Sequence, residues 1–257
     1  MWLYFPVDVY EAVARRKSPL IPPRGMRFRD SSTYLSVGKR GVESLIRECG
    51  LQPGHNILDV GCGTGAMALP LMDYLTTGSY VGFDIVPSWI TWCQRHITSR
   101  NPRFHFELID VYSKQYNSSG TLNAETLRFP YGGDSFDCVV LMSIFTHMRP
   151  AEIRNYIREV SRVMKEGAKS FITAFLINEE SAEAIKKGRS AFSFKHKFGD
   201  CLVIDEMFPE AAIAVPEDQL VSWLADVGLS VEKVTYGSWA GRSSPENLHD
   251  DLIVQKL

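Results

Sequence analysis

A glycine-rich turn between a short apolar run and a helical pattern constrains this chain more than any other segment. Residues 56–60 read Asn-Ile-Leu-Asp-Val, which is typical of a buried strand, and Gly61, Gly63 and Gly65 follow at alternate positions. Glycine permits backbone angles that other residues avoid, and it lets the main chain approach a ligand closely. The free N–H groups of a helix that begins here would point at that ligand. The turn therefore predicts a binding site for a cofactor that contains a nucleoside.

The rest of the chain alternates between short apolar runs and helical periodicity. We expect strands at 55–60, 79–84, 103–108, 136–142, 169–177, 229–236 and 251–256. Helices are expected at 7–17, 36–49, 65–76, 87–99, 150–165 and 216–227. Such alternation predicts parallel strands joined by right-handed crossovers, and the short link between the last two strands predicts an antiparallel pair. The fold class is thus α/β, a Rossmann-like doubly wound sheet with helices on both faces.

The length fits one domain with three regions. Residues 1–50 are expected to form an N-terminal helical lid, residues 51–177 the cofactor-binding core, and residues 178–257 a substrate-side insertion followed by the terminal strand pair. Two less regular segments, 111–128 and 178–215, start where predicted strands end. Ligands of open α/β sheets bind at these carboxyl ends, so the two segments are expected to wall the substrate site unless they are plain surface loops.

Composition narrows the class of partner. The formal net charge is -2 with 23% charged residues, which gives no electrostatic reason for a nucleic-acid partner. The longest apolar candidate, 171–177, is too short to span a membrane, and the N-terminus lacks the apolar run of a signal peptide. Five cysteines without a CxxC pair favour a reduced, cytoplasmic protein, and six scattered histidines give no metal site. The oligomeric state stays open.

Two carboxylates decide between cofactor classes. Asp84 ends the second predicted strand, 23 positions after Gly61, where its oxygens can accept hydrogen bonds from ribose hydroxyls. Gly61, Gly63 and Ala66 also satisfy the dinucleotide fingerprint, so a nicotinamide-dependent oxidoreductase is an alternative. Asp59 argues against it, because a carboxylate two residues before the first glycine suits a cationic amino group better than a pyrophosphate. The chain also has no Tyr-x-x-x-Lys pair.

Four motifs in order carry a family resemblance. Ile57-Leu58-Asp59-Val60-Gly61-Cys62-Gly63-Thr64-Gly65 resembles motif I of the class I S-adenosylmethionine-dependent methyltransferases. Residues 82–87 resemble the second motif of that family, residues 129–140 its fourth-strand motif, and residues 162–168 its "RVLKPGG" turn with Glu and Ala replacing Pro and the second Gly. The resemblance covers residues 50–177. It implies a seven-stranded sheet with an antiparallel last strand, and S-adenosyl-L-methionine as the methyl donor.

The resemblance also implies roles for single residues. The cofactor-binding residues would be Asp59, Gly61, Cys62, Gly63, Gly65, Asp84, Ile85, Asp110, Val111, Met142 and Ser143. The glycine loop would line the methionine portion, with Asp59 at the amino end and Met142 and Ser143 nearby. Asp84 would bind the ribose, while Ile85, Asp110 and Val111 would meet adenine. Two alternatives stay open: Cys62 as a small loop filler, and Asp110 as a helix or turn cap.

The acceptor site is expected near the end of the fourth strand. Methyl transfer is a direct displacement, which needs an acceptor in line and a base if the acceptor is a hydroxyl. His147 is the candidate catalytic base, with a structural role in the turn before Pro150 as its alternative. The candidate substrate-binding residues are Tyr112, Tyr116, Phe145, Trp239 and Arg242, with Tyr34 and Lys39 as weaker candidates in the lid.

Trp239 and Arg242 would suit a planar ring or a sugar together with a carboxylate, and core or loop packing is the alternative for Trp239. Residues 145–178 and the Trp-Gly-Arg loop resemble bacterial methyltransferases of glycan or secondary-metabolite pathways. We therefore expect O-methylation of a small-molecule or glycan hydroxyl. N- or C-methylation, a nicotinamide-dependent oxidoreductase, and a cofactor-binding protein without transferase activity are the alternatives.

Overall fold

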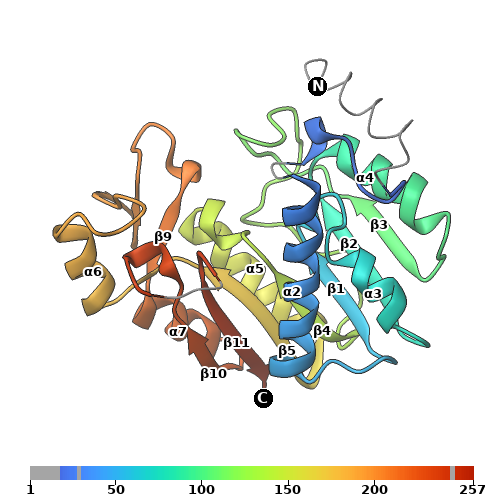
Figure 1. The fold of residues 1–257 in the computed structure, drawn as a ribbon. Coiled ribbons are helices and arrows are strands. Elements are labelled where there is room, and N and C mark those ends of the chain that lie inside the picture. Colours follow the sequence, from blue (N-terminus) through green and yellow to red (C-terminus); the bar gives the residue numbers. More distant parts are fainter. Residues whose placement is uncertain (1–17, 28–29, 244–246) are drawn as a thin grey trace. The chain divides into compact units, whose positions relative to one another are not determined.

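The structure, a computed structural model, describes residues 18–27, 30–243 and 247–257. The helix expected at 7–17 lies outside these residues. The chain divides into two compact units, Met1–Ile109 and Asp110–Leu257. Seven strands form one sheet in the order β10-β11-β5-β4-β1-β2-β3, and Figure 1 follows them along the chain. The predicted α/β class and the number of strands are thereby confirmed.

The first unit opens with a 3-10 turn, η2 (Arg24–Met26), and a long helix, α2 (Ser31–Cys49). Asp30 caps α2 by accepting hydrogen bonds from the Ser32 and Thr33 N–H groups, so the helix begins earlier than the predicted residue 36. Gly50, at φ 66°, ends it in the left-handed conformation. A Cβ on Gly38 would lie 2.1 Å from the Ala66 carbonyl oxygen, so this glycine lets α2 approach the glycine loop closely.

Three parallel strands make up the sheet of the first unit. They are β1 (Asn56–Val60), β2 (Ser79–Asp84) and β3 (Phe104–Leu108), with Asp59 opposite Gly82 in the register. The helices between them are α3 (Ala68–Tyr74) and α4 (Pro87–Cys93), and α4 continues into a π-helical turn, η3 (Gln94–Thr98). Strands β1 and β2 are mostly buried, which explains why they appear in the sequence as short apolar runs, whereas β3 at the edge of the sheet buries only alternate residues.

The second unit carries the other four strands of this sheet. Strand β4 (Phe136–Leu141) runs parallel to β5 (Met164–Ala174), and β11 (Asp250–Lys256) pairs antiparallel with both β5 and β10 (Leu229–Thr235). The predicted antiparallel terminal pair is confirmed. Two helices connect the strands: α5 (Pro150–Val163), which has proline in its first turn, and α7 (Glu217–Ala225).

A second, four-stranded sheet follows β5. Its strands are β6 (Leu176–Ile177), β7 (His196–Phe198), β8 (Cys201–Val203) and β9 (Ile213–Pro216), in the order β6-β9-β8-β7. Helix α6 (Glu179–Lys186) follows β6, and the short turns η4 (Phe145–His147), η5 (Pro209–Ala211) and η6 (Ser238–Ala240) complete the unit. The stretch after residue 178, which the sequence indicates only as less regular, thus contains one short helix and three short strands. Strands of two to four residues are too short to produce a detectable sequence period.

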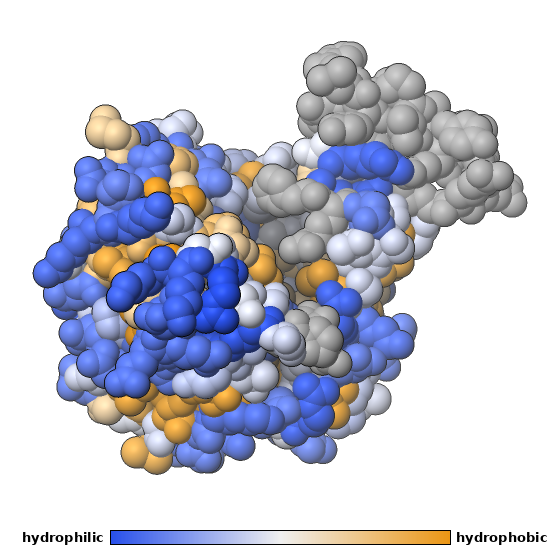
Figure 2. Space-filling view, turned by 60° about the vertical axis from the view of Figure 1, so that its left-hand side comes forward, coloured by the Kyte–Doolittle hydropathy of each residue, from blue (hydrophilic) through white to orange (hydrophobic). Residues whose placement is uncertain are grey.

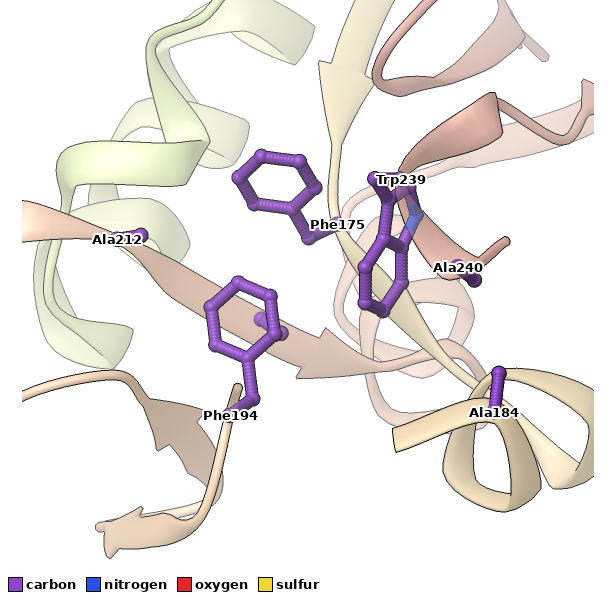
Figure 3. Close-up of a cluster of buried hydrophobic side chains, with 7 residues drawn as sticks. Phe175, Ala184, Phe194, Ala212, Trp239 and Ala240 are labelled. Carbon is purple, nitrogen blue, oxygen red and sulfur yellow. The ribbon is translucent and has the colours of Figure 1, made fainter. Parts of the chain in front are cut away.

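A cluster of aromatic and alanine side chains forms the core beneath this second sheet (Figure 3). Phe175, Phe194 and Trp239 form its centre, with ring centroids 5.3 to 5.4 Å apart in every pair. Phe175 stands between β5 and β6, so one residue links the main sheet to the small one. Trp239 is 0% exposed, and its indole N–H donates to Asp250 Oδ2 at 2.7 Å.

The face drawn in Figure 2 is mainly hydrophilic, with smaller hydrophobic patches between charged side chains. No helix in the described part of the chain is long and apolar enough to cross a membrane. All five cysteines are free thiols.

Candidate active site

The glycine loop after β1 is held in an unusual conformation. Gly61, Gly63 and Gly65 have φ angles of 72°, 56° and 79°, a region that glycine adopts without steric cost. The N–H groups of Gly61 and Cys62 both donate to the Phe83 carbonyl oxygen, at 2.8 and 3.0 Å, which ties the loop to the end of β2. A Cβ on Gly63 would meet no atom within 4 Å, so the main chain here borders open space that a ligand can fill.

The neighbouring glycine has a different function. A Cβ on Gly65 would lie 2.7 Å from the Ile97 side chain, so this glycine permits close packing. The Cys62 side chain packs against Gly82. A Cβ on Gly82 would lie only 2.8 Å from the Cys62 Cβ, so Cys62 fills the space that this glycine leaves. Burial raises the pKa of the Cys62 thiol well above its ordinary value, which keeps it neutral and unreactive. This agrees with the interpretation of Cys62 as a small loop filler.

Asp84 connects the end of β2 to the glycine loop. Its Oδ2 accepts a hydrogen bond from the Gly63 N–H at 2.8 Å, and its Oδ1 accepts one from the Val86 N–H at 3.0 Å. The side chain is only 6% exposed, and burial raises its pKa although these N–H groups oppose the shift. The carboxylate oxygens therefore lie beside the open face of Gly63, with lone pairs that can accept further hydrogen bonds. Ile85 follows, half-buried.

Asp59 is a second buried carboxylate in the same unit. It is 4% exposed, and its Oδ2 accepts a hydrogen bond from the Tyr80 hydroxyl at 2.6 Å. Burial raises the pKa of Asp59 to about 6, and the negative charge of Asp84 adds to the shift. No Lys or Arg among the described residues forms an ion pair with Asp59. A cationic amino group on a cofactor would supply the missing positive charge, so the residues present fit a cofactor of this kind.

Helix α2 supports the glycine loop from the side. The Tyr34 hydroxyl donates to the Thr64 carbonyl oxygen at 2.8 Å and lies 3.3 Å from Thr64 Oγ1. Tyr34 thus positions the loop, although it was expected only as a weak candidate in a lid. Lys39, the other candidate, is exposed and forms a surface ion pair with Glu43 at 3.7 Å. Such pairs contribute little to stability.

In the second unit, Asp110 organises the 111–128 segment. Its Oδ1 accepts a hydrogen bond from Asn117 Nδ2 at 3.0 Å, and its Oδ2 accepts one from the Thr121 hydroxyl at 2.8 Å. The hydrogen bond from Asn117 contributes most to lowering the pKa of Asp110, and the hydrogen bond from Thr121 contributes next. Val111 is buried and forms an isolated β-bridge with Leu122. The geometry matches the turn-capping alternative for Asp110, and contact of Asp110 and Val111 with adenine stays a prediction.

The end of β4 carries a conformational irregularity. Ser143 has φ 58°, which is uncommon for a residue with a side chain, and its N–H donates to Thr173 Oγ1 at 2.7 Å. Such conformations persist where the surroundings enforce them, and they gather at functional sites. Met142, just before it, is half-buried. Both residues thus follow β4 directly, as predicted.

His147 occupies the turn after β4 and contacts both predicted wall segments. Its Nδ1 lies 2.8 Å from the Glu210 carbonyl oxygen in segment 178–215, and its ring meets Tyr116 of segment 111–128 edge-on at 5.8 Å. The segments also touch each other, because Lys114 Nζ donates to the Met207 carbonyl oxygen at 3.2 Å. A carbonyl oxygen only accepts hydrogen bonds, so Nδ1 is the nitrogen that donates. In the neutral form of the ring, Nε2 then holds the lone pair and can accept a proton.

Sequence reasoning missed Arg149 and Glu210, which form a half-buried ion pair beside His147. Glu210 Oε1 accepts hydrogen bonds from Arg149 Nε at 2.9 Å and from Arg149 Nη2 at 2.6 Å. Glu210 is 8% exposed. No local signal identifies this pair, because 61 positions separate the two residues. A glutamate after Phe-Pro at the start of a short turn resembles any surface loop.

The remaining acceptor candidates lie in different environments. Tyr112 is 50% exposed, whereas Phe145 is buried in η4. Trp239 belongs to the aromatic core, and Arg242 pairs with Glu180 at 2.8 Å and approaches Asp250 at 3.5 Å. The position of Trp239 matches its packing alternative, and Arg242 is engaged by two acidic side chains. Among the five substrate candidates, Tyr116 is the one that the described contacts bring against the His147 ring.

The fold is Rossmann-like, and its glycine loop follows the first strand, where a nucleoside cofactor is predicted to bind. Residues 57–167 match a family model described as a methyltransferase domain. A curated relative, methyltransferase GfsG of Streptomyces halstedii, is 26% identical over 59% of this chain and 50% of its own length. A 2-phytyl-1,4-naphtoquinone methyltransferase of Trichormus variabilis is 25% identical over 55% of this chain and 57% of its own length.

Solved structures agree with this assignment. A structure titled as a SAM-dependent methyltransferase of Methanosarcina mazei superimposes with a TM-score of 0.57 at 25% identity, covering 83% of this chain and 97% of the other. Residues 57–167 are thus similar to a methyltransferase domain, and the fold is similar to that of a SAM-dependent methyltransferase. The chain spans about half the length of the curated relatives it matches.

Proposed function

We propose that this protein transfers a methyl group from S-adenosylmethionine to a hydroxyl oxygen of a small molecule. The observation that carries the proposal is the buried carboxylate of Asp84 beside the open face of Gly63, together with a second buried carboxylate, Asp59, in the same unit. The named substrate of the Trichormus relative supports a small-molecule acceptor. A glycan hydroxyl belongs to the same chemical class.

The chain's own residues fit the parts of that cofactor. Asp84 would accept hydrogen bonds from the ribose hydroxyls, and Asp59 would balance the charge of the amino group. Gly63 would leave room for the methionine portion where a side chain would intrude. When bound, S-adenosylmethionine supplies a methyl group that its sulfonium makes electrophilic.

His147 favours oxygen as the methyl acceptor. With Nδ1 donating to the Glu210 carbonyl, the neutral form of the ring would present Nε2 as a base. A hydroxyl must lose its proton as the oxygen forms its new bond to carbon, and Nε2 would take that proton. A neutral amine already has a lone pair for the attack, so N-methylation needs no base before the transfer.

The test compares two glycines of similar geometry in the same unit. Gly63 and Gly50 have φ angles of 56° and 66°, and a Cβ on either would meet nothing within 4 Å. Alanine at each position should cost about 1–2 kcal/mol of folding free energy through the left-handed conformation. Only Gly63→Ala should also weaken S-adenosylhomocysteine binding, by tenfold or more in calorimetry. Equal affinities in the two variants would contradict the proposed cofactor site.

Turnover and ligand specificity complete the test. S-adenosylhomocysteine should raise the melting temperature of the wild-type protein, and NADH should not. A methyl-transfer assay with a panel of hydroxyl compounds then addresses the acceptor. Stabilisation by NADH alone would support the oxidoreductase alternative instead.

A further inference from the structure

We propose that the Glu210 carboxylate is a specificity determinant that accepts a hydrogen bond from a second hydroxyl group of the methyl acceptor. The acceptors of this enzyme would then be diols, in which one hydroxyl is methylated and another binds Glu210. This inference rests on the proposed function, because it assigns a substrate class to the same site.

One carboxylate oxygen of Glu210 lacks a hydrogen-bond partner. Arg149 occupies Oε1 with two donors, whereas Oε2 is buried and bonds to no described residue. Burying such an oxygen without a donor costs about 1–3 kcal/mol, so native proteins seldom leave one unsatisfied. Glu210 is more than nine-tenths buried. A bound ligand with a donor group would satisfy this oxygen.

Glu210 also contacts the proposed base through its backbone. The backbone carbonyl of the same residue accepts the hydrogen bond from His147 Nδ1, so one residue both orients the imidazole and presents Oε2. A second buried atom without a described partner, Thr146 Oγ1, lies next to His147 in η4. The residue before His147 and the residue whose carbonyl accepts from it thus each bury a polar atom that a polar ligand could satisfy.

The charge balance at Glu210 favours a neutral donor. Arg149 already neutralises the carboxylate, and a cationic group on the ligand would be repelled by the guanidinium at this short range. A hydroxyl has no charge to repel and donates one hydrogen bond, which is what Oε2 can accept. We therefore assign a hydroxyl rather than an ammonium group as the partner.

The segment that carries Glu210 is fixed at both ends. Residues 204–212 connect β8 to β9, whose residues Val203 and Ile213 pair antiparallel. Ala212 packs in the aromatic cluster of Figure 3, which anchors the end that follows Glu210. Lys114 lies over the Phe208 ring at 5.0 Å and holds the segment from the other side. A carboxylate on such a support can discriminate between ligands.

The experiment replaces the hydrogen-bond acceptor Oε2 of Glu210 and keeps the contact of the other oxygen with Arg149. In Glu210→Gln, the amide oxygen can still accept from Arg149, whereas the amide NH₂ puts a donor where Oε2 was. Glu206→Gln is the matched control, because Glu206 lies in the same segment and is 68% exposed. Each variant is assayed with catechols and methyl glycosides, every one paired with its analogue that lacks the second hydroxyl. Melting temperature and S-adenosylhomocysteine affinity monitor folding and the cofactor site.

We expect Glu210→Gln to raise KM for the diols by about 10–100-fold and to leave KM for the deoxy analogues unchanged. Glu206→Gln should change neither. An equal effect on diols and analogues, or no effect on either, would overturn the assignment and leave the proposed function intact. If the wild-type protein methylates deoxy analogues as efficiently as diols, the assignment also fails. A wild-type protein that methylates no hydroxyl compound would overturn the proposed function itself.

Discussion

Replacing Asp59 with asparagine should make the protein more stable and a poorer binder of its cofactor. Burial raises the pKa of this carboxyl from its ordinary 3.8 to about 6, so the ionised form is disfavoured in the folded protein. The stability that the neutral carboxyl contributes is fully present below pH 3.8 and is lost as the pH rises through about 6. At roughly 1.4 kcal/mol for each pH unit between these values, ionisation costs about 3 kcal/mol at pH 7.5.

Asparagine removes this cost because it stays neutral at every pH. Its side-chain oxygen can still accept the hydrogen bond from Tyr80 that Asp59 accepts at 2.6 Å. The variant should therefore exceed the wild type by up to about 3 kcal/mol at pH 7.5, or roughly 5–10 °C in melting temperature, and match it near pH 4. Differential scanning calorimetry of both proteins without ligand, across this pH range, measures the difference directly.

Cofactor binding should change in the opposite direction. The amino group of S-adenosylhomocysteine would lose its charged partner, which should weaken binding at pH 7.5 by about tenfold or more in titration calorimetry. The wild-type affinity should also fall below pH 6 as Asp59 takes up a proton, and the variant should lose the Asp59 part of that dependence. A variant that is less stable than the wild type at pH 7.5, or that binds equally well, would refute the reasoning.

Two further predictions concern the second unit. His147→Ala should lower kcat for a hydroxyl acceptor by about 10²–10⁴-fold and flatten the acid side of the pH–rate profile. The affinity for S-adenosylhomocysteine should stay unchanged. Full activity of the variant across the pH range would rule out His147 as a general base. Trp239→Phe should lower the free energy of unfolding by about 1–3 kcal/mol, because Asp250 is fully buried and loses a 2.7 Å hydrogen bond. Urea denaturation measures this loss, and an unchanged midpoint would show that Asp250 finds another donor.

The sequence identified the elements whose signals are local. Strand β2 coincides with the predicted 79–84, and the glycine loop has the left-handed angles that its composition demands. The spacing of apolar residues in a strand and the glycine content of a loop are properties of adjacent residues. They can therefore be recognised in the sequence without knowing the fold. The small sheet could not be predicted this way, since β6 has two residues and its partner β9 lies far along the chain.

In the candidate site, too, the residues with a local signal could be predicted, whereas their distant partners could not. His147 stands out as a histidine after the fourth strand, but its tautomer depends on the Glu210 carbonyl 63 positions away. Trp239 and Arg242 are also understood only through a distant partner. An aromatic and an arginine in a loop can meet a ligand or a buried carboxylate, and only the fold brings Asp250 to them. Residue type alone carries no information on that choice.

The paired ends of the segment between β8 and β9 suggest a way to redesign this protein. Because Val203 and Ile213 are joined across the hairpin, the residues between them can be exchanged without altering where the chain leaves and re-enters the sheet. Because the two ends of the loop are already paired, lengthening it would add little to the entropy cost of closing it. Libraries confined to residues 204–209 would vary the surroundings of the proposed acceptor site while the Glu210 carbonyl keeps its hydrogen bond with His147. Selectivity could thus be evolved separately from the chemistry of methyl transfer.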